Sequence, residues 1–421
     1  MKGFVCSIAV AAVALGISFS PCLAAEEDPS ARPNSLEALI DVLAEKGILT
    51  SEESDGLKAR VAEAEKPAPP PAPEKPKYPT VKTKVRLETR FSSVQEDENQ
   101  PDFSNRDDRT GGDGFAVRRA RLYFFGDLSP ETGYKVQYQS DWGQTSPNLH
   151  VAQMDYRGWD FADLSIGQLQ TPFGYEIVLS DAYLLCTDRA AVSNFLPADK
   201  DIGIMLSSKA AASEPLGWQF FLGNGSGKYS ANPSSDYLWI GRLVASPTPT
   251  LDLGLSLSSN SNTDFSPYQS RFLKKNGDPY GLLPAYAAAE ADESSWEFDF
   301  QWTNNSSSVW GEYLRTKIDS VGGPSNTADG YYLYLHQFLP YQGGNDKLEA
   351  ILGYQQFDPN DSVTDIYDLT SYTLGLNYHL KGGRYAKQAC QEMIRFNYIW
   401  NREAADEVDN DKFVVQYQTW F

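Results

Sequence analysis

The chain has very few of the residues that build covalent or metal-linked scaffolds. Four cysteines and three histidines occur in 421 residues. Two cysteines lie near the N-terminus, and the other two, Cys186 and Cys390, are far apart; this excludes a disulfide scaffold or a structural zinc site and leaves open whether the two pair. His150, His336 and His379 share no ligand spacing, so each is interpreted as an ordinary buried or lumenal side chain. No metal and no cofactor are expected.

Long apolar runs and positive charge are also scarce. Beyond the first 25 residues no stretch approaches the roughly 18 consecutive apolar residues of a spanning helix. A membrane location would therefore require a closed β-barrel, because each backbone polar group in lipid needs an internal partner. Lysine and arginine number 36 against 56 aspartates and glutamates, a formal net charge of −20, which argues against a nucleic-acid partner.

Residues 1–25 are typical of a signal peptide. MKGFVCSIAVAAVALGISFSPCLAA starts with a basic residue, continues as an apolar run and ends in small residues, with cleavage expected after Ala24 or Ala25. An uncleaved anchor helix is the alternative, disfavoured because the run is short for a bilayer core of about 30 Å. A lipoprotein signal at Cys22 is rejected because Pro21 precedes it.

Residues 26–65 predict a helical segment. Its apolar residues fall at helical spacing up to Gly47, and Thr50 and Glu53 form a capping box for a second helix. The apolar stripe is too narrow for a core of its own, so we expect packing against copies of itself, as in a coiled coil, or against another partner; a solvated helix is the alternative. Residues 66–79, KPAPPPAPEKPKYP, form a semi-rigid polyproline linker.

From residue 80 to 421 the apolar period changes to two, and sixteen strands are expected. They lie near residues 81–92, 115–126, 132–142, 148–158, 162–170, 200–209, 216–224, 236–246, 250–259, 294–303, 308–318, 330–340, 346–357, 369–381, 391–401 and 412–421. Connections after even-numbered strands are short and those after odd-numbered strands are mostly long and polar. Outer-membrane barrels share this pattern, with tight periplasmic turns and long outer loops.

Strand length supports the same interpretation. Ten residues at about 3.3 Å each, tilted by about 45°, rise roughly 23 Å, close to an apolar band of about 25 Å. The predicted fold is all-β: a 16-stranded antiparallel transmembrane β-barrel in the cell outer membrane of a Gram-negative-type envelope, with the N-terminal helices as a periplasmic extension.

Charge decides which face of each strand meets lipid. In residues 81–91, VKTKVRLETRF, one parity is uncharged and the other is almost entirely charged. Turning the charged parity outward would cost about 2–4 kcal/mol for each central Lys or Arg. We therefore place the charges in the lumen. The same test in RRARLYFFG places Arg119 and Arg121 inside and Ala120, Leu122 and Phe124 outside.

Basic residues on lumen-facing positions predict a pore-lining basic wall. Its members are Lys82, Lys84, Arg86, Arg90, Arg119, Arg121, Arg157, Arg242 and Arg395. A positive wall in a narrow, low-dielectric pore raises the local anion concentration. The alternative is ordinary lumen charge balanced by acids such as Glu88, Asp155, Glu297 and Asp299.

Five segments together resemble the phosphate-selective porin O and P family. They are FAVRRARLYFFGDLSPETGYKVQYQSDW, LSIGQLQTPFGYE, DIGIMLSS, GWQFFLGNG and GRLVASPTP, and EKGILTSEE is similar to the periplasmic extension of that family. The resemblance covers essentially the whole mature chain. It implies a trimeric outer-membrane porin, in a family whose best-known members draw phosphate or polyphosphate inward with arginines and lysines.

The connection after the fifth strand is long and rich in apolar residues, so we expect it to pack against something. It is the third outer loop, which in a porin folds inward and narrows the pore; covering the barrel mouth or meeting a neighbouring subunit are the alternatives. The charged residues predicted for this constriction are Glu176, Asp181, Asp188, Arg189 and Lys200.

The function expected is passive diffusion of small hydrophilic solutes, anionic or neutral, and a preference for phosphate-like anions is the subsidiary expectation. A barrel with a mainly adhesive or envelope-anchoring role is the alternative, through contact of the N-terminal helices with peptidoglycan or another envelope component. No enzyme is expected, because no nucleophile, base and orienting group stand together in the pattern.

The chain ends on FVVQYQTWF, in which Phe413, Tyr417 and Phe421 share the outward parity. This ending resembles the signal by which outer-membrane barrels are handed to the barrel-assembly machinery. The last strand must also pair with the first near Val81, because an unpaired sheet edge cannot lie in membrane lipid.

Overall fold

The chain divides into two compact units, Met1–Lys75 and Pro76–Phe421. This computed structural model describes residues 35–64, 77–95, 114–141, 148–209, 215–229, 231–232, 236–262, 291–304, 306–323, 325–340, 347–362, 364, 368–381, 391–405 and 409–421. The predicted signal peptide, most of the predicted linker and Cys390 lie outside these residues. In the described part of the chain, no helix is both long enough and apolar enough to cross a membrane.

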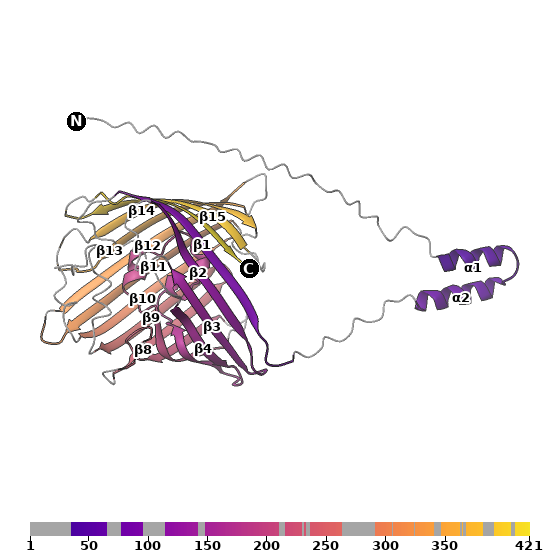
Figure 1. Ribbon diagram of the computed structural model, residues 1–421, viewed down its shortest axis with the longest axis horizontal. Coiled ribbons are helices and arrows are strands. Elements are labelled where there is room, and N and C mark those ends of the chain that lie inside the picture. The colour runs from indigo at the N-terminus through magenta and orange to yellow at the C-terminus, as the bar shows by residue number, and fades with distance from the viewer. Residues whose placement is uncertain are drawn as a thin grey trace, which may run out of the picture. The chain divides into compact units, whose positions relative to one another are not determined.

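The first unit contains two helices, α1 (Ser35–Glu45) and α2 (Ser51–Ala64), folded into a hairpin (Figure 1). Gly47 follows α1 with φ 69°, a left-handed conformation that glycine adopts without strain. The backbone N–H of Thr50 donates to Glu53 Oε2 at 2.9 Å, and that of Glu53 donates to Thr50 Oγ1 at 3.3 Å. The capping box predicted from the sequence is therefore confirmed.

The second unit is a closed barrel of sixteen antiparallel strands, as predicted (Figure 1). Each strand pairs with its neighbours in sequence, and β16 pairs with β1. The strands are β1 (Lys82–Val94), β2 (Gly114–Asp127), β3 (Thr132–Asp141), β4 (Asn148–Tyr156), β5 (Ala162–Gln170), β6 (Lys200–Ser208), β7 (Leu216–Gly223), β8 (Leu238–Thr248), β9 (Leu251–Asn262), β10 (Ala291–Thr303), β11 (Ser307–Ser320), β12 (Ser325–Leu339), β13 (Leu348–Asp358), β14 (Leu369–Lys381), β15 (Gln391–Glu403) and β16 (Lys412–Trp420).

Outward-facing side chains of the barrel are mostly apolar, whereas most charged and amide side chains face the lumen. Along β14, Ser371 and Asn377 are buried, whereas Tyr372, Leu374 and Leu376 between them are exposed. Large apolar side chains are likewise exposed on β2, β8, β9, β10, β12 and β16. The outer face thus has the composition that lipid requires, and the predicted outward positions of Leu122 and Phe124 on β2 and of Phe413 and Tyr417 on β16 are confirmed.

The first and last strands close the barrel. The N–H of Val85 donates to the carbonyl of Phe421 at 2.9 Å, and the N–H of Phe421 donates to the carbonyl of Val85 at 3.1 Å. Phe413 and Tyr417 are exposed on the outer face of β16, and Phe421, which follows the strand, is exposed too. Because the two strands are bonded along their shared length, neither leaves an open edge there.

Strand β2 contains one irregularity that simple alternation does not predict. Glu88 of β1 pairs with Arg119, but the next residue, Thr89, pairs with Val117, so Arg118 is an extra residue in a β-bulge. Arg118 and Arg119 are consecutive, yet both are buried in the lumen. Strict alternation would have turned Arg118 to lipid, at a cost of about 2–4 kcal/mol near the membrane centre.

The bulge can be tested with two single-residue deletions in β2. Deleting Arg118 should leave a regular strand with Arg119 and Arg121 still inside, so the barrel should assemble. Deleting Ala120 shortens the regular part of β2 by one residue. If the bulge is kept, Arg121 turns outward, and if the bulge is lost, Arg119 turns outward, so assembly should fail in both cases. The difference between boiled and unboiled electrophoretic mobility measures assembly; equal assembly of the two deletions would contradict this account.

Candidate functional site in the barrel lumen

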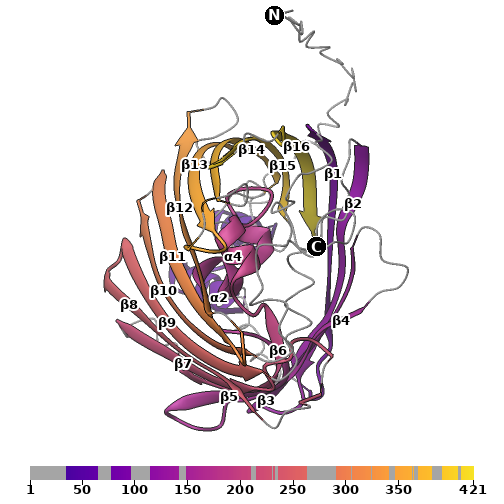
Figure 2. The ribbon, with the colours of Figure 1, turned by 90° about the vertical axis from the view of Figure 1, so that its left-hand side faces the viewer.

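The connection between β5 and β6, residues 171–199, folds into the barrel; we call it the constriction loop. It contains α3 (Tyr175–Val178), the 3-10 turn η2 (Asp181–Tyr183) and α4 (Ala191–Phe195). Figure 2 shows α4 inside the ring of strands, beside β12 and β13. Inward folding also explains why apolar loop residues such as Leu184 are almost completely buried.

One side of the constriction loop packs on an apolar part of the lumen wall. Phe195 stacks on Phe357 of β13 with ring centroids 5.8 Å apart, and Tyr175 meets Trp310 of β11 edge-on at 5.3 Å. Val192 joins the same buried cluster. Fully burying an apolar side chain of this size contributes about 1.5–3 kcal/mol, so these contacts fix the loop at its α3 and α4 ends.

Glu312 of β11 caps the start of α3. The N–H of Tyr175 donates to Glu312 Oε1 at 3.1 Å, and the Ser193 hydroxyl donates to Oε2 at 3.3 Å. Gly174 precedes the helix with φ 80°, and a Cβ there would lie 2.6 Å from Glu312 Oε1. Only glycine therefore fits both the backbone conformation and the close approach of the carboxylate.

The other side of the loop meets the arginines of β1 and β2. Asp188 accepts a two-pronged bond from Arg90, with Nη1 at 3.2 Å and Nη2 at 3.0 Å from its two oxygens. Arg118 Nε and Lys412 Nζ lie 3.9 and 3.8 Å from the same carboxylate. Forked contacts of this kind fix both position and orientation.

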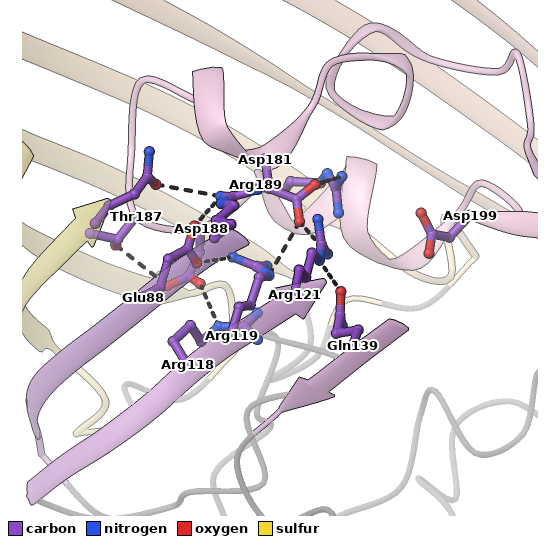
Figure 3. Close-up of polar contacts among 12 residues, drawn as sticks. Glu88, Arg118, Arg119, Arg121, Gln139, Asp181, Thr187, Asp188, Arg189 and Asp199 are labelled. Carbon is purple, nitrogen blue, oxygen red and sulfur yellow. Dashed lines mark hydrogen bonds and ion pairs between the residues drawn. The ribbon is translucent and has the colours of Figure 1, made fainter. Parts of the chain in front are cut away.

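Asp181 lies among three guanidinium groups (Figure 3). Its Oδ2 is 3.2 Å from Arg119 Nε and 2.7 Å from Arg121 Nη2, and its Oδ1 is 2.6 Å from Arg189 Nη2. Burial opposes ionisation of this carboxyl group, but the positive charges of Arg121, Arg189 and Arg119 outweigh it and hold the pKa of Asp181 well below its ordinary value.

Side chains of the wall also bond the loop backbone. Arg395 Nη2 donates to the carbonyl of Ala182 at 3.1 Å, and Gln418 donates to the same carbonyl at 3.1 Å. Asn377 donates to the carbonyl of Leu185 at 3.0 Å. The middle of the loop is therefore held by bonds to three strands near the barrel seam, β14, β15 and β16.

The structure brings together eight of the residues selected from the sequence. They are Arg86, Arg90, Arg119, Arg121 and Arg395 of the basic wall and Asp181, Asp188 and Arg189 of the loop. With Arg118, Lys412 and Glu88 they form one group, which we call the arginine cluster. All its side chains are buried or nearly so. Whether they line a conducting pore stays a prediction.

The other selected residues lie elsewhere. Lys82 is exposed at the start of β1, and Lys84 lies over the Trp420 ring at 5.2 Å. Arg157 is exposed and pairs with Asp127 at the end of the barrel that carries the short turns.

Arg242 of β8 pairs with two acids of β10, Glu297 at 3.0 Å and Asp299 at 2.6 Å. Lys200 pairs with Asp199 at 2.9 Å, and Glu176 lies beside Glu312.

Three residues of the site were not selected from the sequence. Arg118 enters the lumen through the bulge, and the pair Arg118–Arg119 inside a lipid-crossing strand is the signal that could have predicted it. Lys412 falls on the inward parity of β16, so alternation alone could have found it. Glu312 meets a loop helix that lies 136 residues away in sequence, and no local pattern indicates such a contact.

Two of the three histidines converge on one carboxylate. His336 Nε2 lies 2.8 Å from Glu349 Oε1, and His379 Nε2 lies 3.4 Å from Glu349 Oε2. All three side chains are buried, as is His150 on β4. Among the described residues no group of three or more His, Cys, Asp or Glu side chains is arranged to hold a metal ion.

Residues 88–419 match the family model described as phosphate-selective porin O and P. An uncharacterized protein of Aquifex aeolicus (strain VF5) is 24% identical over 94% of this chain and 96% of its own length.

Solved porin structures share the fold at low identity. In-vitro folded OmpT of Vibrio cholerae, in a trimer form, has a TM-score of 0.53 at 12% identity, covering 81% of this chain and 99% of its own. The anion-selective porin from Comamonas acidovorans has a TM-score of 0.52 at 12% identity, covering 81% of this chain and 98% of its own.

A closed sixteen-stranded barrel with an apolar outer face and a loop folded into a charged lumen defines a porin, a passive channel of the outer membrane. Within that class, the family match spans most of the chain. The protein belongs to the phosphate-selective porin O and P family.

The carboxyl group of Glu176 gives loop docking a pH dependence. Burial, followed by repulsion from Glu312, raises the pKa of Glu176 from its ordinary 4.5 to about 8. The docked loop therefore holds a proton that an undocked, solvated Glu176 releases, so docking weakens as pH rises between 4.5 and about 8. Raising the pH from about 6 to about 9 should increase open-channel current noise.

Glu176→Gln should remove most of this pH response, because glutamine stays neutral and still accepts the 2.8 Å bond from the Ala190 N–H. Glu131→Gln, in an exposed turn between β2 and β3, is the matched control and should respond like the unmodified protein. An unchanged response in Glu176→Gln would show that another group is responsible.

Proposed function

We propose that this porin conducts small hydrophilic solutes, anionic or neutral, and favours anions, phosphate-like anions among them, over cations. The observation that supports this is the charge balance of the arginine cluster, in which eight cationic side chains face three carboxylates. An uncompensated positive charge in a low-dielectric passage attracts anions and repels cations. An anion-selective porin also occurs among proteins of similar fold.

Reversal potentials in planar bilayers test this proposal. Under a potassium chloride gradient the unmodified protein should favour chloride. Arg86→Gln should lower the chloride-to-potassium permeability ratio about two- to threefold, because it removes one buried charge of the cluster. Arg157→Gln, at an exposed pair with Asp127, is the control and should change the ratio little. A preference of the unmodified protein for potassium would refute the proposed selectivity.

We assign no catalytic role to the lumen. Among its carboxylates, Glu88 pairs with arginines, Glu349 with histidines and Glu312 with loop backbone groups, which supports a solute passage rather than a reaction site.

We also propose a homotrimer. One similar fold is described in a trimer form. An apolar groove of about 500 Å³ on the outer face of β16, β1 and β2, lined by residues including Phe91, Phe115, Val117, Val415 and Tyr417, would suit the subunit contact. Exposed Phe413, Tyr417 and Phe421 support a role for β16 in recognition by the barrel-assembly machinery.

We place the N-terminal extension in the periplasm, where it would contact peptidoglycan, another envelope component or its own copies. β1 starts at the end of the barrel that carries the short turns, which supports this side. In the helical hairpin Ile40 is buried but Leu39, Val42 and Ile48 are exposed. A segment of about 30 residues with one small core ordinarily needs a partner.

Deleting residues 26–75 separates the channel from a mainly anchoring role, which is the second candidate function. The barrel forms a compact unit of its own, so the deletion variant should assemble and keep its single-channel conductance. Envelope attachment, measured as co-sedimentation with purified peptidoglycan, should fall. Loss of conductance in an assembled variant would contradict this division of roles.

A further inference from the structure

We propose that Asp181 and Asp188 act as tethered internal occupants of the guanidinium groups that they contact, so that an anion from solution binds to those groups only by displacing one of the two aspartates. This inference rests on the proposed preference for anions. It identifies these two aspartates as selectivity-determining residues, because they set how strongly an anion must compete to enter the arginine cluster.

The position of each carboxylate is one that a small oxyanion would take. Asp188 lies in the fork of Arg90, and the two nitrogens of that fork match two oxygens of a carboxylate or of a phosphate equally well. Asp181 bridges Arg119 and Arg121 through one oxygen and Arg189 through the other. Neither aspartate belongs to the barrel wall, since both are carried by the constriction loop (Figure 3).

Arg86 indicates that the cluster can accept more negative charge than it holds. Its side chain is 1% exposed, and its Nη2 contacts Glu88, yet among the described residues its Nε and Nη1 atoms have no hydrogen-bond partner. Buried donors of this kind are costly to leave unsatisfied. An entering anion that reached Arg86 would satisfy them, whereas the loop carboxylates contact other members of the cluster.

Tethering determines which anions can compete. A carboxylate held on a docked loop has a high effective concentration at its site, so a weakly bound monovalent anion such as chloride displaces it rarely. A multivalent oxyanion offers two charges and several acceptor oxygens, so it can replace the carboxylate and contact further guanidinium groups at the same time. The two aspartates should therefore favour multivalent oxyanions over chloride as bound species.

The test measures the inorganic phosphate concentration that halves the chloride current in planar bilayers at constant ionic strength. Asp181→Asn leaves Arg119, Arg121 and Arg189 without their shared carboxylate. The phosphate concentration should then fall at least about tenfold, because the competing loop has lost one charge-assisted contact. Asp199→Asn is the matched control, because Asp199 lies in the same loop but its carboxylate pairs with Lys200 rather than with Arg119 or Arg121 (Figure 3). The control should match the unmodified protein.

The double variant Asp181→Asn with Arg189→Gln distinguishes occupancy from net charge. It removes one negative and one positive charge, so net charge is unchanged, but Arg119 and Arg121 still lose their carboxylate. If occupancy by the carboxylate is decisive, the double variant should lower the phosphate concentration that halves the current by about as much as Asp181→Asn does. A fall in the single variant that the double variant lacks would overturn the proposal, and so would no fall in either.

Hydrogen exchange on the unmodified protein tests the same idea if a variant does not assemble. Phosphate should speed exchange of the backbone amides in residues 180–189, whereas chloride at equal ionic strength should not, because only phosphate displaces the loop carboxylates. Equal exchange in both salts would overturn the inference. A preference of the unmodified channel for potassium would instead refute the proposed anion selectivity, so the two failures are distinguishable.

Discussion

A strand that crosses lipid can place neither charge nor unpaired backbone groups on its outer face. This constraint accounts for the closure of β1 on β16, for the exposed aromatic and aliphatic side chains along the outside, and for the burial of strand charges such as Arg86, Arg90 and Arg121. It also explains the bulge at Arg118, which turns two consecutive arginines inward. Charge that cannot face lipid accumulates in the lumen, and the lumen must then stabilise it.

The constriction loop stabilises the charge that accumulates in the lumen. Buried arginines need counter-charges, and the loop supplies two carboxylates, while its apolar side chains cover the apolar wall of β11 to β13. The two sides of the loop are therefore held by different forces. Burying apolar surface fixes its α3 and α4 ends, and charge-assisted hydrogen bonds fix its middle. Removing one member of a buried ion pair leaves the charge of the other uncompensated. The charged side of the loop therefore tolerates only partners of the opposite charge.

The parts of this structure that the sequence predicts depend on local patterns. Sixteen strands, their inward and outward residues and the capping box at Thr50 each follow from residues a few positions apart. Contacts between distant segments do not. Arg90 and Asp188 are 98 residues apart, and their pairing depends on how deeply the loop enters the barrel. The alternation of charge places Arg90 in the lumen but carries no information on its partner there.

Net charge and local charge have opposite signs in this protein. The chain carries a formal charge of −20, yet the arginine cluster is positive. Charges in water are screened beyond about 8 Å at physiological ionic strength, whereas charges in a narrow, low-dielectric passage are screened much less. A solute inside the lumen therefore responds to the side chains around it and hardly to acids elsewhere on the chain. The same reasoning makes loop position important for selectivity, because a shift that moved Asp181 away from Arg121 would change the local balance without changing the composition.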